Sequence, residues 1–173
     1  TWSTPWTWAA AGAYRVFADF QPARAGSAKL TLTRTVEVAG AFAPVAPSTT
    51  RTVDEVAGYT VELDGALTAG VAKQLTATVT RDGQPVRALQ PYLGAYGHLV
   101  ALREGDLAYL HVHPEGAEPV PGRTGGPAVP FAATAPTAGR YLLYLDFFFD
   151  DTAPTATYAL DVPAALRVWP APQ

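Results

Sequence analysis

Three histidines are the residues of this chain whose type and spacing point most directly to chemistry. They are the only histidines among 173 residues, and all lie in one short stretch, at His98, His111 and His113. Two apolar runs flank a turn at Glu104-Gly105 in this stretch, which predicts a β-hairpin. Neutral imidazole is a common ligand of copper and zinc, so the stretch is a candidate transition-metal site.

The register of the predicted hairpin decides whether the three rings meet. If Arg103 pairs with Asp106 across a two-residue turn, counting back along both strands places His98 opposite His111. Directly opposed residues share a face of the sheet, with Cβ atoms about 4.5–5.5 Å apart, and so does a residue two positions further on, here His113. Without thiolate or thioether ligands, such a site favours Cu(II) or Zn, with copper as the first expectation. A register displaced by one residue separates His98 from the pair.

The same histidines have a structural interpretation. They can be hydrogen-bonded residues at the core or rim of a sheet, and the His-x-His-Pro end can simply fix the exit of a strand. The predicted face also carries Val100, Leu102 and Leu107, which are side chains typical of an inward-facing strand.

The composition predicts a folded domain and limits the function classes. Hydrophobic residues make up 49% of the chain, and the net charge of −3 offers no basic surface for nucleic acid. No apolar run approaches the ~18–20 residues of a membrane span. The absence of cysteine excludes a disulfide framework and a thiolate metal site. No Gly-x-Ser-x-Gly motif or phosphate-binding glycine loop occurs, so we expect no enzyme.

The alternation of apolar and polar residues predicts the elements that position the histidines. Short alternating runs recur about every 8–12 residues with Gly and Pro between them, which is typical of an all-β sandwich. The predicted fold is an immunoglobulin-like β-sandwich preceded by a partial second sandwich repeat. The expected parts are the partial repeat at 1–50, a linker at 51–57, the sandwich at 58–168 and a tail at 169–173. The strands are expected at 13–20, 29–38, 58–64, 72–81, 97–103, 107–113, 128–134, 139–148 and 155–162.

An internal repeat is the basis for the partial N-terminal copy. Three pairs of segments align: Ala11–Phe20 with Ala138–Phe147, 30–38 with 155–162, and Thr1–Trp8 with Pro127–Thr134. Residues 1–50 are therefore expected to be the last three strands of a second sandwich. Three strands alone leave an apolar face and open edges.

Alternation within the first repeat identifies the face that needs a cover. Tyr14, Val16, Ala18 and Phe20 form its more apolar side and are expected to be buried. We expect other protein strands or subunits to complete residues 1–50. They are expected to come from a second chain, as in a homo-oligomer, or from an N-terminal fragment that precedes Thr1, rather than from the sandwich at 58–168.

The histidine stretch and the C-terminal repeat also carry a resemblance to a known family. The runs Gly97–Leu102, Leu107–Pro114 and Ala138–Phe147 resemble secreted or envelope β-sandwich proteins of bacteria that are often labelled heavy-metal-binding. These are similar in plan to small immunoglobulin-like domains found near copper-handling proteins. The resemblance covers most of 58–162, and it implies an extracellular or periplasmic, cell-envelope location. It also implies that His98, His111 and His113 occupy the family's Gly-His and His-x-His-Pro positions.

Three functions therefore follow from the sequence as alternatives. The first is a non-enzymatic metal-binding module for copper or zinc. The second is a structural or assembly module whose incomplete N-terminal sandwich is completed by another chain, with structural histidines. The third is carbohydrate binding through Trp2, Trp6 and Trp8, if these side chains are exposed rather than part of a core.

Overall fold

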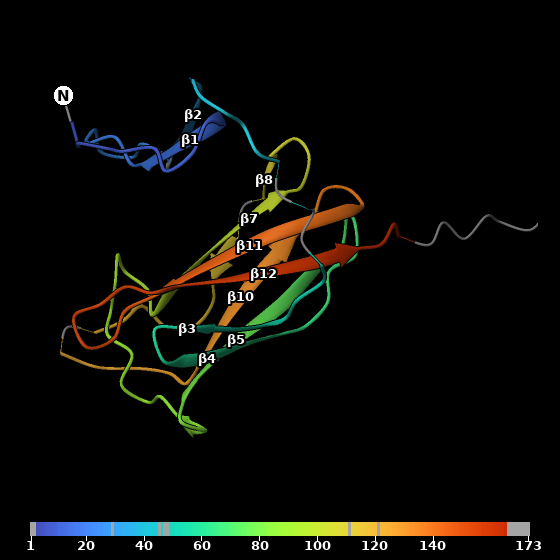
Figure 1. Ribbon diagram of the computed structural model, residues 1–173. Coiled ribbons are helices and arrows are strands. Elements are labelled where there is room, and N and C mark those ends of the chain that lie inside the picture. Colours follow the sequence, from blue (N-terminus) through green and yellow to red (C-terminus); the bar gives the residue numbers. More distant parts are fainter. Residues whose placement is uncertain are drawn as a thin grey trace, which may run out of the picture. The chain divides into compact units, whose positions relative to one another are not determined.

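A computed structural model describes residues 3–28, 30–44, 46, 49–110, 112–120 and 122–165. The chain divides into two compact units, Thr1–Pro47 and Ser48–Gln173, called unit 1 and unit 2 below. All regular elements of the described residues are strands (Figure 1), which confirms the predicted all-β class. Over those residues, no helix is long and apolar enough to cross a membrane.

Unit 1 contains one antiparallel hairpin. Its strands are β1 (Gly12–Phe20) and β2 (Leu30–Val38), with Gly12 opposite Val38 and Phe20 opposite Leu30. The sequence predicts a third strand before β1, but residues 3–8 are not in a strand. A strand forms only when its backbone groups find a ladder partner, and the sheet of unit 1 is limited to β1 and β2 over the described residues.

Unit 2 consists of two sheets that face each other. The first sheet has the strand order β3-β4-β5-β10-β9, with β6 beside β5, and the second has the order β12-β11-β7-β8. Read as A to G, strands β4, β5, β7, β9, β10, β11 and β12 give the ABED and GFC sheets of an immunoglobulin-like sandwich. The bounds are β3 (Val53–Val56), β4 (Tyr59–Asp64), β5 (Ala72–Arg81), β6 (Gln84–Pro85), β7 (Gly97–Arg103), β8 (Tyr109–Leu110), β9 (Val112–Pro114), β10 (Ala128–Thr134), β11 (Gly139–Phe147) and β12 (Thr155–Val162).

The core of unit 2 lies between the two sheets. Every second residue of β11 is buried, because successive side chains of a strand point to opposite faces. From the other sheet, Val61, Leu75 and Phe131 are buried in the same cluster. The second sheet therefore turns one apolar face inward, and the first sheet covers it.

Both lateral edges of the sandwich are bridged by a segment that passes from one sheet to the other. On one side, β8 pairs with β7 in the second sheet, whereas β9, which follows almost directly, pairs with β10 in the first. On the other side, Arg51 bridges to Ala159 of β12, and the chain then enters the first sheet as β3. Two predictions were wrong here. The expected strand 107–113 is divided between two sheets, and the expected linker 51–57 contains a strand of the sandwich.

A buried tyrosine fixes the turn that leads into β11. Tyr141 is 1% exposed, and its hydroxyl donates to the carbonyl oxygen of Thr137 at 3.0 Å. This is the tyrosine corner that immunoglobulin-like sandwiches place at the start of strand F. Gly139 enters the strand with a φ of +141°, a conformation that side chains strongly disfavour.

Replacing Tyr141 by Phe should destabilise unit 2, because it leaves the Thr137 carbonyl oxygen without this donor. We expect a loss of about 1–2 kcal/mol in the free energy of unfolding, measured by urea denaturation. Tyr144→Phe is the matched control, since Tyr144 lies in the same strand but on the outer, half-buried face. A surface change of this kind should stay within about 0.5 kcal/mol. Equal losses in the two variants would contradict a special role for the Tyr141 hydroxyl.

Candidate functional site

The histidine hairpin has a different register from the one predicted. Leu102 pairs with Tyr109 and Ala101 with Leu110, and the backbone N–H of Arg103 donates to the carbonyl oxygen of Ala108 at 2.9 Å. The prediction placed Val100 opposite Tyr109, so the two strands are displaced by two residues from the expected pairing. The connecting loop has four residues, 104–107, instead of two.

The cause of the longer loop is its own side-chain chemistry. The Arg103 guanidinium forms an ion pair with the Asp106 carboxylate, which also accepts the backbone N–H of Ala108 at 3.1 Å. These two hydrogen bonds hold the pKa of the Asp106 carboxyl well below its usual range. Leu107 takes a φ of +53°, a left-handed backbone conformation, at the last position of the four-residue loop.

His98 lies on the outer face of β7 and is tied to a neighbouring turn. Its Nε2 is 2.7 Å from the carbonyl oxygen of Tyr92. A carbonyl oxygen can only accept, so Nε2 carries the proton and donates it. The Tyr92 ring packs edge-on against His98 and stacks on Phe148 at 5.6 Å. Nδ1 is therefore the nitrogen of His98 that could bind a metal, and many metal-bound histidines donate their other N–H to a backbone carbonyl in this way.

The other two histidines do not complete a site within the described residues. His113 is exposed on β9, opposite Ala132, so it belongs to the first sheet whereas His98 belongs to the second. His111 lies outside the described residues. Over the part of the chain that is described, no three His, Asp or Glu side chains gather closely enough to hold a metal ion. The three-histidine site stays a prediction that depends on His111.

The hairpin of unit 1 reproduces the C-terminal hairpin of unit 2 in structural detail. The Tyr14 hydroxyl donates to the carbonyl oxygen of Ala10 at 2.9 Å, four residues back, as Tyr141 does to Thr137. Gly12 has a φ of +142°, against +141° at Gly139. The repeat seen in the sequence is therefore also a repeat of structure, and β1–β2 corresponds to β11–β12.

A cross-strand hydrogen bond repeats as well. Thr31 donates to Asp19 in unit 1, and Thr155 donates to Asp146 in unit 2. Each pair is directly opposed in its ladder. The two hairpins thus share their register along the whole length of both strands.

The candidate functional site is the face of β1–β2 that corresponds to the buried face of β11–β12. We call it the open face, and it comprises Tyr14, Val16, Ala18, Phe20, Leu30, Leu32, Arg34, Val36 and Val38. Val16, Phe20, Leu30 and Leu32 are 43%, 43%, 45% and 59% exposed, whereas Tyr141, Leu143, Leu145 and Phe147 of unit 2 are at most 1% exposed. The predicted apolar face is therefore present, but its side chains are not buried.

Two tryptophans lie near the start of this hairpin. Trp8 packs against Tyr14 with ring centroids 4.4 Å apart, and Trp6 meets Trp8 edge-on at 6.1 Å. Trp6 is 72% exposed, so it does not belong to a core. Trp2 lies outside the described residues. The Trp6–Trp8 pair adds exposed aromatic surface to unit 1.

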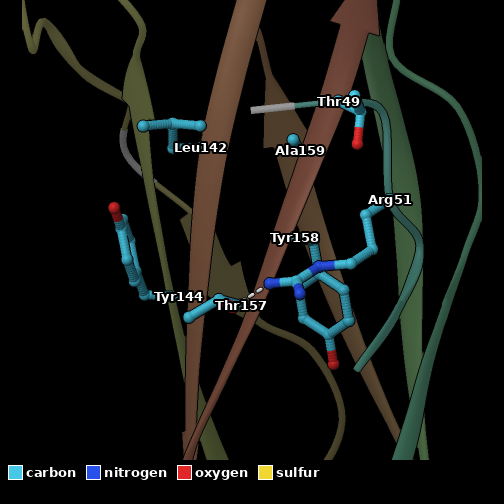
Figure 2. Close-up of a pocket in the computed structure, with 7 residues that line it drawn as sticks. All are labelled: Thr49, Arg51, Leu142, Tyr144, Thr157, Tyr158 and Ala159. Carbon is cyan, nitrogen blue, oxygen red and sulfur yellow. Dashed lines mark hydrogen bonds between the residues drawn. The ribbon is translucent and has the colours of Figure 1, made fainter. Parts of the chain in front are cut away.

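A shallow pocket in unit 2 holds a structural contact (Figure 2). It has a volume of about 330 Å³ and lies between the outer faces of β11 and β12 and the segment around Arg51. The Arg51 guanidinium reaches over β12 to the Thr157 hydroxyl. It also forms an ion pair with Asp54 at 3.3 Å. Asp54 also accepts the backbone N–H of Thr157 at 2.8 Å. Arg51 and Thr157, whose side chains meet in this pocket, hold the 49–56 segment against β12.

This contact escaped the sequence analysis, although a signal for it exists. The run Val53-Asp54-Glu55-Val56 contains two β-branched valines, which favour strands, but it follows a stretch rich in Pro, Ser and Thr that indicates a linker. Beside the contact, burial raises the pKa of the Tyr158 hydroxyl, and the nearby Asp54 carboxylate raises it further.

The strand order and the tyrosine corner place unit 2 among the immunoglobulin-like β-sandwich proteins. Residues 52–164 match the family described as "Domain of unknown function (DUF8832)", and the chain belongs to this family. Comparisons with curated proteins and with solved structures found no match. The family boundary at residue 52 agrees with the start of the sandwich at β3 rather than at 58.

Replacing His98 by Ala should destabilise unit 2 whether or not metal is present. The change removes the donor to the Tyr92 carbonyl oxygen and the ring that packs against Tyr92, so we expect a loss of about 1–2 kcal/mol. Chemical denaturation with and without EDTA measures it. Leu93→Ala in the same turn is the control, because Leu93 is 79% exposed. A loss that disappears in EDTA would show that His98 acts through a metal instead.

The predicted metal site has a direct test at His111. If the three histidines hold one ion, His111→Ala should weaken binding of Cu(II) or Zn more than about tenfold, since even outer-shell changes cost that much. Titration calorimetry of wild type and variant measures the difference. Equal affinities in the two proteins would exclude His111 as a ligand.

Proposed function

We propose that this protein is a non-enzymatic structural module in which immunoglobulin-like sandwiches are assembled in series. Unit 2 is one complete sandwich. The hairpin of unit 1 is the last pair of strands of another sandwich, completed by β-strands from outside the described residues. The histidines have a structural role in this proposal, as His98 does at the Tyr92 turn.

The observation that carries the proposal is the match between an open and a covered copy of the same hairpin. The two copies share the tyrosine corner, the entering glycine and the Thr–Asp cross-strand bond. In unit 2 the apolar face of this hairpin forms half of the core, while in unit 1 the equivalent face is exposed. The strands that cover this face in unit 2 therefore indicate which strands a complete unit 1 sandwich requires.

Stability supports the same conclusion. A two-stranded hairpin is marginally stable at best in water. Burying a large apolar side chain fully contributes about 1.5–3 kcal/mol, and the four large side chains of the open face are about half exposed, so covering them is worth roughly 4 kcal/mol. Contiguous exposed apolar surface of this kind commonly marks an interaction site.

The other two alternatives from the sequence have less support. Binding of copper or zinc requires His111 to join two histidines that lie on different sheets. Carbohydrate binding requires a flat aromatic platform, but Trp6 and Trp8 meet at an interplanar angle of 65°. An extracellular or cell-envelope location remains an expectation from the resemblance.

Self-association through the open face tests the proposal. We expect the 173-residue chain to associate as its concentration rises, because the exposed apolar side chains find one another. Leu32→Asp should weaken this association more than about tenfold, which corresponds to 1.4 kcal/mol. Analytical ultracentrifugation over a range of concentrations measures the dissociation constant.

Thr33→Asp is the matched control, because Thr33 is the next residue of β2 and is exposed on the opposite face of the hairpin. It adds the same charge without touching the open face. The proposal fails if the chain stays monomeric at all concentrations while amides of β1–β2 exchange as slowly as those of β11–β12. Such a result would mean that the hairpin needs no partner.

A further inference from the structure

The order of strands in unit 2 indicates where the missing part of the unit 1 sandwich comes from. Resting on the proposed function, we infer that the open face is covered by a segment of the same polypeptide on the N-terminal side of Thr1. This segment carries the counterparts of β3, β4, β5, β7 and β9, lays its β7 counterpart antiparallel beside β1, and presents a carboxylate to Arg34.

The first argument comes from residues 3–8. Aligned without a gap from Gly12 and Gly139, residues 1–7 correspond to 128–134, which form β10 in unit 2. This alignment differs by one residue from the one proposed on sequence alone, and the matching hydrogen bonds of Tyr14 and Tyr141 fix it. It places Trp6 at the position of Ala133, a buried residue of β10.

The alignment explains why residues 3–8 are not in a strand. In unit 2, β10 is paired on both sides, with β5 and with β9. The sheet of unit 1 contains no counterpart of either strand over the described residues. The chain before β1 thus already has the place of strand E, and its missing neighbours are strands that precede E in chain order. A covalent segment upstream supplies them in the order seen in unit 2.

The second argument is the free edge of β1. Its counterpart β11 is paired with β12 on one side and with β7 on the other, from Tyr141 opposite Arg103 to Phe147 opposite Gly97. Over the described residues, β2 is the only strand paired with β1. The second side of β1 therefore fits one more antiparallel strand, in the place that β7 has beside β11. The register of β7 on β11 gives the register of that strand on β1.

The third argument is one charged residue on the open face. Arg34 is opposed to Val16 and takes the place of Tyr158, which is opposed to Leu143 in unit 2. Covering this position without a countercharge would bury an unpaired charge, which is strongly unfavourable. In unit 2 the Asp54 carboxylate accepts the backbone N–H of Thr157, the residue before Tyr158, and it lies near enough to raise the pKa of the Tyr158 hydroxyl. A carboxylate at the counterpart of Asp54 would therefore lie near Arg34 and supply its countercharge.

Hydrogen exchange on two lengths of the polypeptide tests the inference. In the 173-residue chain, alternate amides of β1 face the open edge and should exchange rapidly. In a longer polypeptide that also contains the proposed upstream strands, the same amides should become as protected as those of β11 while the protein stays monomeric. Leu32→Asp should abolish the new protection, and Leu32→Ile, which keeps an apolar side chain of the same volume at that position, should leave it intact.

The other outcomes separate the inference from the proposed function. Protection of β1–β2 that arises only when separate chains associate overturns the upstream segment and leaves the assembly function standing. Strong protection already in the monomeric 173-residue chain overturns both.

A chemical cross-link tests the carboxylate. Arg34→Lys keeps the positive charge and adds an amine that carbodiimide joins to a neighbouring carboxylate. In the extended polypeptide, mass spectrometry should find this residue linked to an upstream Asp or Glu. A link to another chain, or no link in the protected protein, overturns the pairing proposed for Arg34.

Discussion

An antiparallel hairpin with one apolar face is stable only when that face is covered, and the rest of this structure depends on that constraint. In unit 2, β11 and β12 supply one wall of the core and the first sheet supplies the other. The tyrosine corner sets the angle at which the chain enters β11, so that Tyr141, Leu143 and Leu145 all point inward. Unit 1 has the same corner and the same register, and its face is open. The contrast between the two copies carries more functional information than any single side chain.

Edges impose the second constraint. A sheet edge exposes backbone donors and acceptors that favour pairing with other chains. Unit 2 bridges both of its lateral edges with segments that leave one sheet and join the other, at Arg51 to β3 and at β8 to β9. The polar contacts of Arg51, Asp54 and Thr157 hold the first of these segments in place. Over the described residues, no such segment pairs with the second edge of β1, and this is why we propose that edge as a pairing site.

Alternation in the sequence was sufficient to predict most strands, because apolar and polar side chains of a half-buried strand alternate with a period of two residues. It was not sufficient at the histidine stretch, for two physical reasons. The register depends on loop length, and Leu107 adopts a positive φ that its type does not suggest. In addition, apolar and polar residues continue to alternate from β8 into β9, so the sequence does not indicate that the chain moves from one sheet to the other there. The strand β3 was missed because two of its four residues are charged. Alternation also identified the more apolar side of β1, since residue types alone define it, but the predicted burial of that side is not seen, because Val16 and Phe20 are each 43% exposed.

The hydrogen bond of His98 bears on both functional interpretations, and it separates them only when the fold is considered. A donor bond from Nε2 to a backbone carbonyl is what a structural histidine needs, and it is also the usual support for a histidine that binds metal through its other nitrogen. The two interpretations differ in which residues they require around the His98 ring. His98 faces outward from the second sheet beside Tyr92 and Phe148, while His113 belongs to the edge of the first sheet. A metal site would therefore have to span the seam where the chain changes sheets, whereas the structural role uses contacts that already exist. For this reason the open face, which is repeated in detail and left uncovered, is the stronger basis for a functional proposal.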